Sequence, residues 1–334
     1  MKKLKIIAEI GVNHNNKRKI GKKLIIEAKK AGVESVKFQT FKASRLSLRN
    51  TPKVPYQKNN KNESHYQMLE KLELSEKDHL YYLNICKKLN IEFISTPYTA
   101  EDAKFLCSLK LKTIKTSSAD LIDHKLHEYL SKQKMNIIIS TGMATIKEID
   151  DTIKIYEKNK KKNITLLHCI SNYPCSDKSL NMNNINTLKR RYKYPIGFSD
   201  HSIDETASII ALSYGARVFE KHFTLNKNFD GPDHKASATP KELKSYVEKL
   251  NRSFTMLGSY KKIPQKEEKQ MKKISRKSLV YSQNLKKGTK IKLEFIDCKR
   301  PGTGLLSNKI YKIKNKILKK NVKFEQFINL KDIY

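Results

Sequence analysis

The sequence predicts an α/β barrel of about eight strand–helix units, followed by a smaller C-terminal module. Short apolar runs alternate with helical patterns through roughly the first 260 residues. Polar and charged side chains gather where these runs end, which is typical of the functional rim of such a barrel. Two later runs each end in a histidine, His201 and His222. Together these observations predict a closed (β/α)8 TIM barrel.

The expected strands follow one another along the chain with helical patterns between them. The strands are predicted at residues 5–15, 35–41, 91–97, 113–120, 136–143, 164–169, 196–201 and 216–224. The clearest helical patterns cover residues 18–31, 80–90, 102–109, 148–159, 202–215 and 241–257. Each strand is therefore followed by chain that can cover the outside of a barrel.

One interval breaks this rhythm. Residues 43–74 separate the second strand from the next long helix, and this interval is too long for an ordinary connection. Because it leaves the functional rim, we expect a lid or a loop that encloses the substrate.

The composition changes after the last barrel helix. A polar, charged segment follows, and then short strands punctuated by glycine and proline. We therefore predict a catalytic barrel over residues 1–260, a linker over 261–274 and a small domain over 275–334. A domain of fewer than about 70 residues is marginal alone, so this one is expected to dock on another surface.

The charge of +36 raises the question of nucleic-acid binding. The lysines lie on nearly every predicted helix instead of forming one stripe, and no recognisable nucleic-acid motif accompanies them, so that function is not expected. The charge can still help to steer anionic substrates. No apolar run approaches the roughly 20 residues needed to span a bilayer, and no signal-peptide pattern is present, so we expect a cytoplasmic protein without a membrane partner. The five cysteines lack a CxxC pair and are expected to be reduced thiols.

The two strand-end histidines predict a metal site. Either one alone would more often be a hydrogen-bonded structural residue, and only their pairing on neighbouring strands favours ligation. Asp200, Glu220 and Asp233 lie close in sequence, and carboxylates beside neutral imidazoles are typical of divalent-cation sites.

A series of longer motifs extends from Glu9 to Gly304. They read AEIGVNHN, VKFQTFKA, FISTP, ISTGMATIKEI, ITLLHC with NYP, IGFSDHS, FEKHFT, GPDHKAS and KRPGTG. In this order they resemble the sialic acid synthase family, whose members condense phosphoenolpyruvate with an N-acyl amino sugar. The resemblance implies a TIM barrel followed by an antifreeze-like (SAF) domain. It also implies a domain-swapped homodimer in which Arg300 enters the neighbouring active site.

The same resemblance assigns roles to individual residues. His201 and His222 would hold Mn2+, with Mg2+ or Co2+ as alternatives. Glu9, Glu220 and Arg300 would be catalytic, with Glu9 and Glu220 near the sugar and the metal. The substrate-binding set would comprise Lys37, Gln39, Thr96, Ser118, Asp120, Ser140, Ser171, Tyr173 and Asp233.

The chain departs from the family pattern at residues 116–120. It reads TSSAD where many members have PSGE or GSGE, so Asp120 carries a carboxylate one methylene shorter than glutamate. N-acetylneuraminate synthase, using N-acetylmannosamine, is the first functional prediction. N,N'-diacetyllegionaminate synthase, using 2,4-diacetamido-2,4,6-trideoxymannose, is the alternative. Less favoured are another metal-dependent barrel enzyme, such as a hydrolase, and a non-catalytic sugar binder.

Overall fold

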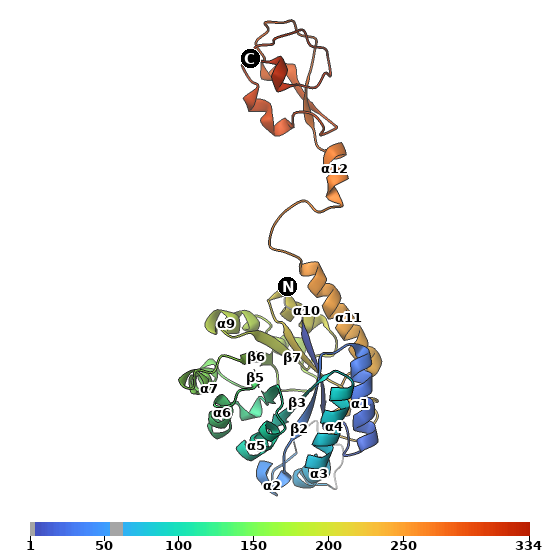
Figure 1. Ribbon diagram of the computed structural model, residues 1–334, viewed down its shortest axis with the longest axis vertical. Coiled ribbons are helices and arrows are strands. Elements are labelled where there is room, and N and C mark those ends of the chain that lie inside the picture. The colour runs from blue at the N-terminus through green and yellow to red at the C-terminus, as the bar shows by residue number, and fades with distance from the viewer. Residues whose placement is uncertain (1–3, 54–62) are drawn as a thin grey trace. The chain divides into compact units, whose positions relative to one another are not determined.

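Eight parallel strands form a closed barrel in sequence order, which confirms the predicted fold class. The computed structural model describes residues 4–53 and 63–334. Figure 1 shows the strands ringed by helices. The barrel strands are β1 (Lys5–Gly11), β2 (Ser35–Thr40), β3 (Glu92–Pro97), β4 (Thr113–Thr116), β5 (Asn136–Ser140), β6 (Ile164–Cys169), β7 (Ile196–Asp200) and β8 (Val218–His222).

The helices of this first unit lie between successive strands or in the connections. They are α1 (Arg18–Ala31), α2 (Ala43–Leu46), α3 (His65–Leu72), α4 (Glu76–Lys88), α5 (Ala100–Ser108), α6 (His124–Ser131), α7 (Ile146–Lys158), α8 (Asp177–Leu180), α9 (Asn184–Arg191), α10 (Thr206–Ser213) and α11 (Pro240–Leu257). Capping boxes explain where several begin: the Thr145 hydroxyl accepts from the backbone of Glu148, whose carboxylate accepts from the backbone of Thr145. The same arrangement opens α3 and α11.

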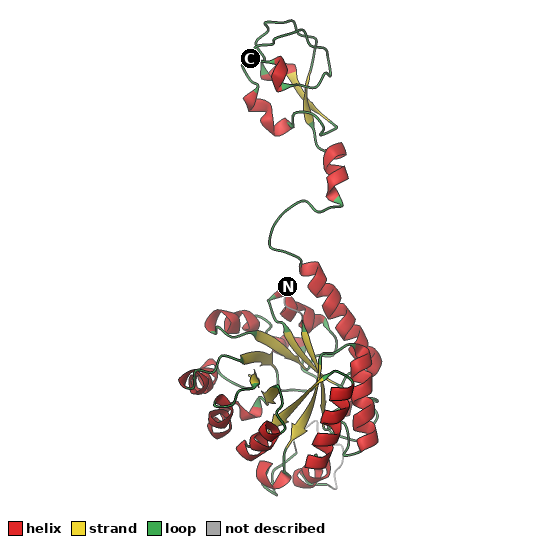
Figure 2. Cartoon of the chain, in the orientation of Figure 1, coloured by secondary structure: helices red, strands yellow, loops and turns green. Residues whose placement is uncertain are grey.

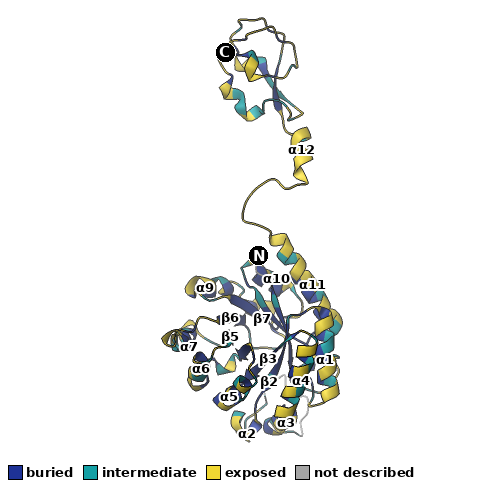
Figure 3. Ribbon diagram, viewed as in Figure 1, coloured by how far each residue is buried: buried dark blue, intermediate teal, exposed yellow. Residues whose placement is uncertain are grey.

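Two apolar regions hold the barrel together. The larger fills the space between strands and helices, so the helices bury one face and expose the other (Figure 3). The smaller lies inside the barrel, where Ile7, Ile94, Ile138 and Leu167 meet from four different strands. Because side chains alternate along a strand, the next inward positions toward the carboxyl ends form a second, polar layer above this floor.

Some predicted boundaries were too long. The fourth strand ends at Thr116, because residues 119–122 turn into a short 3-10 helix that is tied back by Ser117 and Asp120. The predicted helix 202–215 begins only at Thr206, after a loop in which Ser202 bonds to Asp200.

The predicted lid lies partly outside the described residues, since residues 54–62 are not described. In the rest of residues 43–74, α2 and α3 pack together with Val12 and Phe41 in a separate apolar cluster. Its role as a lid stays a prediction.

The chain divides into two compact units, residues 1–258 and 259–334. The second contains α12 (Glu268–Ser275) and the antiparallel pair β9 (Ser278–Tyr281) and β10 (Ile296–Lys299), and loops make up much of the rest (Figure 2). Its own core includes Leu279, Tyr281 and Ile313. Its assignment as a SAF domain stays a prediction.

Throughout the described ranges, 4–53 and 63–334, we find no helix with both the length and the apolar character needed to cross a membrane.

Candidate active site

A buried charged cluster occupies the polar layer inside the barrel. The Lys37 ammonium lies 2.8 Å from Glu9 Oε2 and 3.8 Å from Glu220 Oε2, and it donates a hydrogen bond to Thr96 at 3.1 Å. Gln39 Nε2 donates to Glu9 Oε1 at 3.2 Å. The five side chains come from four strands, β1, β2, β3 and β8. The structure thus brings together five of the residues predicted for the site.

Lys115 completes this cluster, although the sequence prediction did not include it. From β4 it reaches across the barrel to Glu220 Oε1 at 3.3 Å, and Ser199 donates to the same oxygen at 3.0 Å. Lys115 is 4% exposed. The only signal in the sequence was its place inside a short predicted strand, which other lysines in this chain share.

The pKa values of the two carboxyl groups in the cluster are shifted in opposite directions. Burial and the neighbouring charge of Glu220 raise the pKa of Glu9 to about 7, against the opposing effect of Lys37. For Glu220, burial works in the same direction, but Lys115 and Lys37 outweigh it and lower its pKa below the ordinary value. A pair of carboxyl groups separated in this way can supply one group that exchanges protons near neutral pH and one that stays charged.

His201 and His222 lie side by side at the rim, as predicted. Their ring centroids are 5.4 Å apart, and the Tyr173 ring packs 4.0 Å from His201 and 5.1 Å from His222. His201 Nδ1 donates to the Ile170 carbonyl at 2.6 Å, which leaves Nε2 as the atom with a lone pair. Within the described part of the chain, His222 Nδ1 is buried and has no hydrogen-bond partner.

Asp233 approaches these histidines from the loop that follows β8. Its Oδ2 atom is 3.9 Å from His222 Nδ1, and burial raises its pKa to about 6. A Cβ atom added at Gly11 would lie 3.6 Å from this carboxylate and 3.1 Å from Glu9 Oε1. Gly11, which has φ +53°, therefore keeps open the space between the charged cluster and the imidazoles.

Hydroxyl groups gather on the opposite side of the rim, around Gly142. Its backbone N–H donates to Ser118 Oγ at 3.1 Å, and a Cβ atom there would lie 2.5 Å from Ser171 Oγ and 2.8 Å from Ser118 Oγ. Ser140 lies two residues before Gly142, and its buried Oγ has no hydrogen-bond partner among the described residues. The three predicted serines thus lie at or just after the ends of the neighbouring strands β4, β5 and β6. A side chain at position 142 would fill the space between Ser118 and Ser171.

Other predicted residues lie elsewhere or are engaged otherwise. Asp120 accepts a hydrogen bond from Ser117 within its own turn, and burial raises its pKa to about 6. Asp200 faces the helix layer and binds Ser202 and Ser208, so its expected place beside a metal is wrong. Arg300 is an exposed residue of the second unit, and its place in an active site stays a prediction.

The donors at the rim fit a divalent cation in chemistry, although they do not form a complete cage. No group of three or more His, Cys, Asp or Glu side chains in residues 4–53 and 63–334 is arranged to hold a metal by itself. The orphaned Nδ1 of His222 is a suitable nitrogen donor, and so is Nε2 of His201, which has only a long contact of 3.5 Å with Ser199 Oγ and one of 4.0 Å with Cys169 Sγ. Burial first, and then nearby positive groups, keep the pKa of His222 well below 6.5, so this imidazole is neutral and available.

The closed barrel and its rim of lysines, carboxylates, imidazoles and hydroxyls are typical of a barrel enzyme. Comparison with known proteins narrows this class. The NeuB family model matches residues 24–262, so the chain belongs to the NeuB family, which confirms the resemblance.

Three known proteins illustrate the relationship. The N,N'-diacetyllegionaminic acid synthase of Legionella pneumophila is 39% identical over 95% of this chain and 91% of its own. The enzyme of the same name from Campylobacter jejuni is 40% identical over 98% of this chain and 99% of its own. The crystal structure of N-acetylneuraminic acid (sialic acid) synthetase from Leptospira borgpetersenii in complex with citrate has a TM-score of 0.73, with 31% identity over 81% of this chain and 90% of its own.

Proposed function

We propose that this enzyme condenses phosphoenolpyruvate with 2,4-diacetamido-2,4,6-trideoxymannose, forming N,N'-diacetyllegionaminate and releasing phosphate. The observation that carries the proposal is the identity of about 40% with two synthases of that product over almost the full length of each chain. From the sequence alone, N-acetylmannosamine was the first prediction. The comparisons support the alternative sugar better, because the sialic acid synthetase structure is less similar, at 31% identity.

The charged cluster suits phosphoenolpyruvate, which carries a phosphate and a carboxylate. Lys37 and Lys115 face Glu9 and Glu220, so the empty cluster is nearly neutral when both carboxylates are ionised. Because Glu9 has a pKa of about 7, uptake of one proton leaves a net positive charge for an anionic substrate. Thr96 and the hydroxyls around Gly142 add hydrogen-bond donors that suit phosphate and carboxylate oxygens.

The imidazole side of the rim suits the sugar. We propose that His201 and His222 hold Mn2+, with Mg2+ or Co2+ as alternatives, and that Asp233 lies beside the ion. Bound there, the ion would supply Lewis-acid polarisation of the sugar carbonyl. Burial works to lower the pKa of His201, but contact with Cys169 outweighs it and raises this pKa, so the ring must release any proton before it can ligate.

The condensation needs a bond from C3 of phosphoenolpyruvate to the sugar carbonyl carbon, addition of water at C2, and departure of phosphate. Of the two central carboxylates, Glu9 in its ionised form is the better group to position and deprotonate that water, because a pKa of about 7 makes it the stronger base and lets it release a proton taken up earlier. Glu220 remains charged between Lys37 and Lys115 and can stabilise positive charge developing at C2.

We further propose a homodimer to which Arg300 contributes across the subunit boundary, with the second unit acting as a SAF domain. The family resemblance motivates this. Exposed apolar side chains on each unit support it: Met143 and Ile203 on barrel connections are 69% and 85% exposed, and Phe324 and Leu330 of the second unit are 52% and 53% exposed.

Phosphate release measured with phosphoenolpyruvate and each sugar in turn tests the function. We expect kcat/KM to be at least tenfold higher for the diacetamido sugar than for N-acetylmannosamine, because a pocket built around a second acetamido group loses a polar contact without it. Equal or reversed preference would contradict the choice of sugar. Hydrolysis of a sugar without consumption of phosphoenolpyruvate would favour the rival hydrolase instead.

A further inference from the structure

A buried polar network lies behind the two histidines, on the side of the strands that faces the helices. The parallel register of β7 and β8 places Asp200 directly opposite Lys221. Asp200 immediately precedes His201, and Lys221 immediately precedes His222. Because successive side chains of a strand point to opposite faces, these two residues point outward while Ser199 and Glu220 point into the barrel.

Nearly every polar atom of the Asp200–Lys221 pair is used. Asp200 Oδ1 accepts from the backbone and hydroxyl of Ser202, at 2.8 and 2.6 Å, and Oδ2 accepts from Ser208 Oγ at 2.8 Å. The Lys221 ammonium lies 3.3 Å from Oδ2 and donates to the Ser202 carbonyl at 2.6 Å. Ser208 Oγ is 2.6 Å from the Tyr246 hydroxyl, which connects the pair to both α10 and α11.

Because the Asp200–Lys221 pair is buried, it favours one register of β7 and β8 over others. Asp200 is 1% exposed and Lys221 is 5% exposed. A buried ion pair adds little net stability compared with apolar residues of the same size, but an alternative pairing of the strands would separate Lys221 from both Asp200 and the Ser202 carbonyl and leave a buried charge without its partners. A slip of one residue between β7 and β8 would move one histidine by about 3.3 Å along its strand and turn it to the opposite face. The pair therefore opposes the one displacement that would separate the imidazoles.

We propose that the Asp200–Lys221 pair is a positioning device that fixes the register of β7 and β8 and, through it, the spacing of His201 and His222 as ligands for a divalent cation. The inference rests on the proposed metal site and assigns no contact with substrate to either residue. This role explains why a buried charged residue immediately precedes each histidine, Asp200 before His201 and Lys221 before His222.

The test is the affinity for Mn2+ of a double variant, Asp200→Asn with Lys221→Met, measured by titration calorimetry on the full-length protein. Removing both charges leaves no unpaired buried ion, so the variant should fold. We expect the Kd for Mn2+ to rise tenfold or more, as is typical when groups supporting metal ligands are lost. A matched control, Lys5→Met with Glu92→Gln, removes another ion pair, of 2.7 Å, from the opposite ends of the strands and should leave the Kd unchanged. A Kd of the double variant within twofold of the parent would overturn the proposal.

A second measurement separates this inference from the metal assignment. If the parent protein does not bind Mn2+, the metal proposal fails, and long-range 15N–1H spectra of the metal-free protein decide the inference. Shifted imidazole signals of His201 and His222 in the double variant, but not in the control, support positioning, and unshifted signals overturn it. Should the double variant not fold, Ser208→Ala removes one bond to Asp200. It should then raise the Kd threefold or more, or shift the same imidazole signals, and no change in either measurement would overturn the inference.

Discussion

The buried histidine at position 79 makes the barrel sensitive to acid. His79 Nδ1 donates to the Ser75 carbonyl at 2.9 Å, and its Nε2 lies 2.7 Å from the Thr40 hydroxyl, which donates to it. The ring is 0% exposed, and burial lowers its pKa from 6.5 to about 4. The unfolded chain therefore binds a proton between pH 6.5 and 4 that the folded protein excludes. The contribution of His79 to stability is fully present above pH 6.5 and is lost as pH falls toward 4.

The size of the effect follows from the shift. A difference of about 2.5 pH units corresponds to about 3 kcal/mol, most of which is lost between pH 7 and pH 4. We expect His79→Gln to remove this dependence. The free energy of unfolding of the parent, measured by urea denaturation, should therefore fall by about 3 kcal/mol more than that of the variant over this range. Asn84→Gln, on the exposed face of the same helix, should behave like the parent. Identical pH dependence in the parent and His79→Gln would refute the reasoning.

Four further predictions concern function. Lys37→Met should reduce kcat/KM for phosphoenolpyruvate by at least 100-fold, because it removes a buried cation from the charged cluster. Lys22→Ala, on an outer helix, should change kcat/KM less than twofold. Equal effects of the two substitutions would mean that Lys37 has no special role. Chelation should abolish phosphate release and Mn2+ should restore it, so full turnover by metal-free protein would contradict the metal site. Gly142→Ala should raise KM for phosphoenolpyruvate about tenfold, since the methyl group would lie 2.5 Å from a neighbouring hydroxyl, and an unchanged KM would place the phosphate elsewhere. Heterodimers of one Arg300→Ala chain and one His222→Ala chain should regain activity. If the arginine acts across subunits, one of their two active sites carries both substitutions and the other carries neither. Inactive heterodimers would assign Arg300 another role.

The barrel could be predicted because its signals are local and repeated. Each apolar run, its polar end and the helix that follows can be read without knowing where the rest of the chain lies. The grouping of Glu9, Lys37 and Glu220 followed from the same reasoning, since the carboxyl ends of parallel strands share one rim. The pairing of His201 with His222 was predicted on the same basis and is present in the structure.

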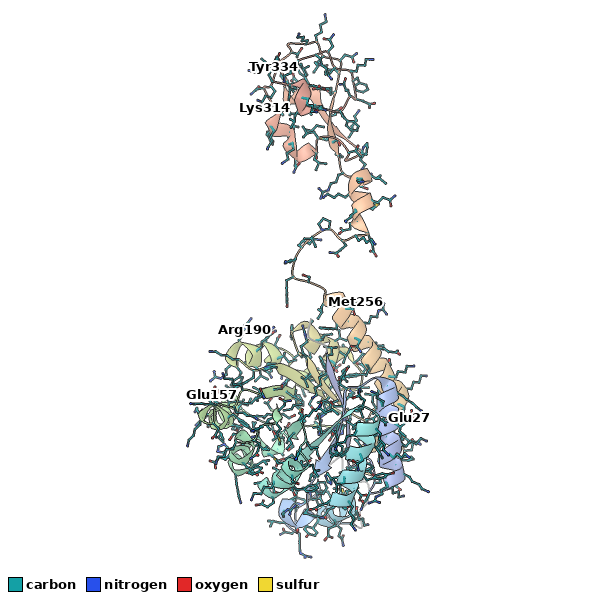
Figure 4. All side chains as sticks on the ribbon, in the orientation of Figure 1. Glu27, Glu157, Arg190, Met256, Lys314 and Tyr334 are labelled. Carbon is teal, nitrogen blue, oxygen red and sulfur yellow. The ribbon has the colours of Figure 1, made fainter. Side chains whose placement is uncertain are left out.

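The errors concern the direction of side chains. Lys115 was missed because a buried lysine inside a short apolar run looks like the many exposed lysines of this chain. Charged side chains on the outer helices, such as Glu157 and Arg190, are exposed in the same way (Figure 4). Asp200 was placed near the metal because it adjoins His201, but adjacent residues on a strand face opposite ways. The turn at Asp120 depends on two hydrogen bonds between Ser117 and Asp120, which composition alone does not predict.

The apolar floor formed by Ile7, Ile94, Ile138 and Leu167 also bears on the order in which the two substrates bind. These side chains are at most 3% exposed, so they close the barrel interior below the charged cluster. The charged cluster lies deeper than the imidazoles, so a ligand seated at the rim would stand between the cluster and solvent. If phosphoenolpyruvate occupies the cluster and the sugar occupies the rim, the two substrates must enter in that order, and water and phosphate must use the same opening. Steady-state inhibition by excess sugar, competitive with phosphoenolpyruvate, is the kinetic signature of such a dead-ended site.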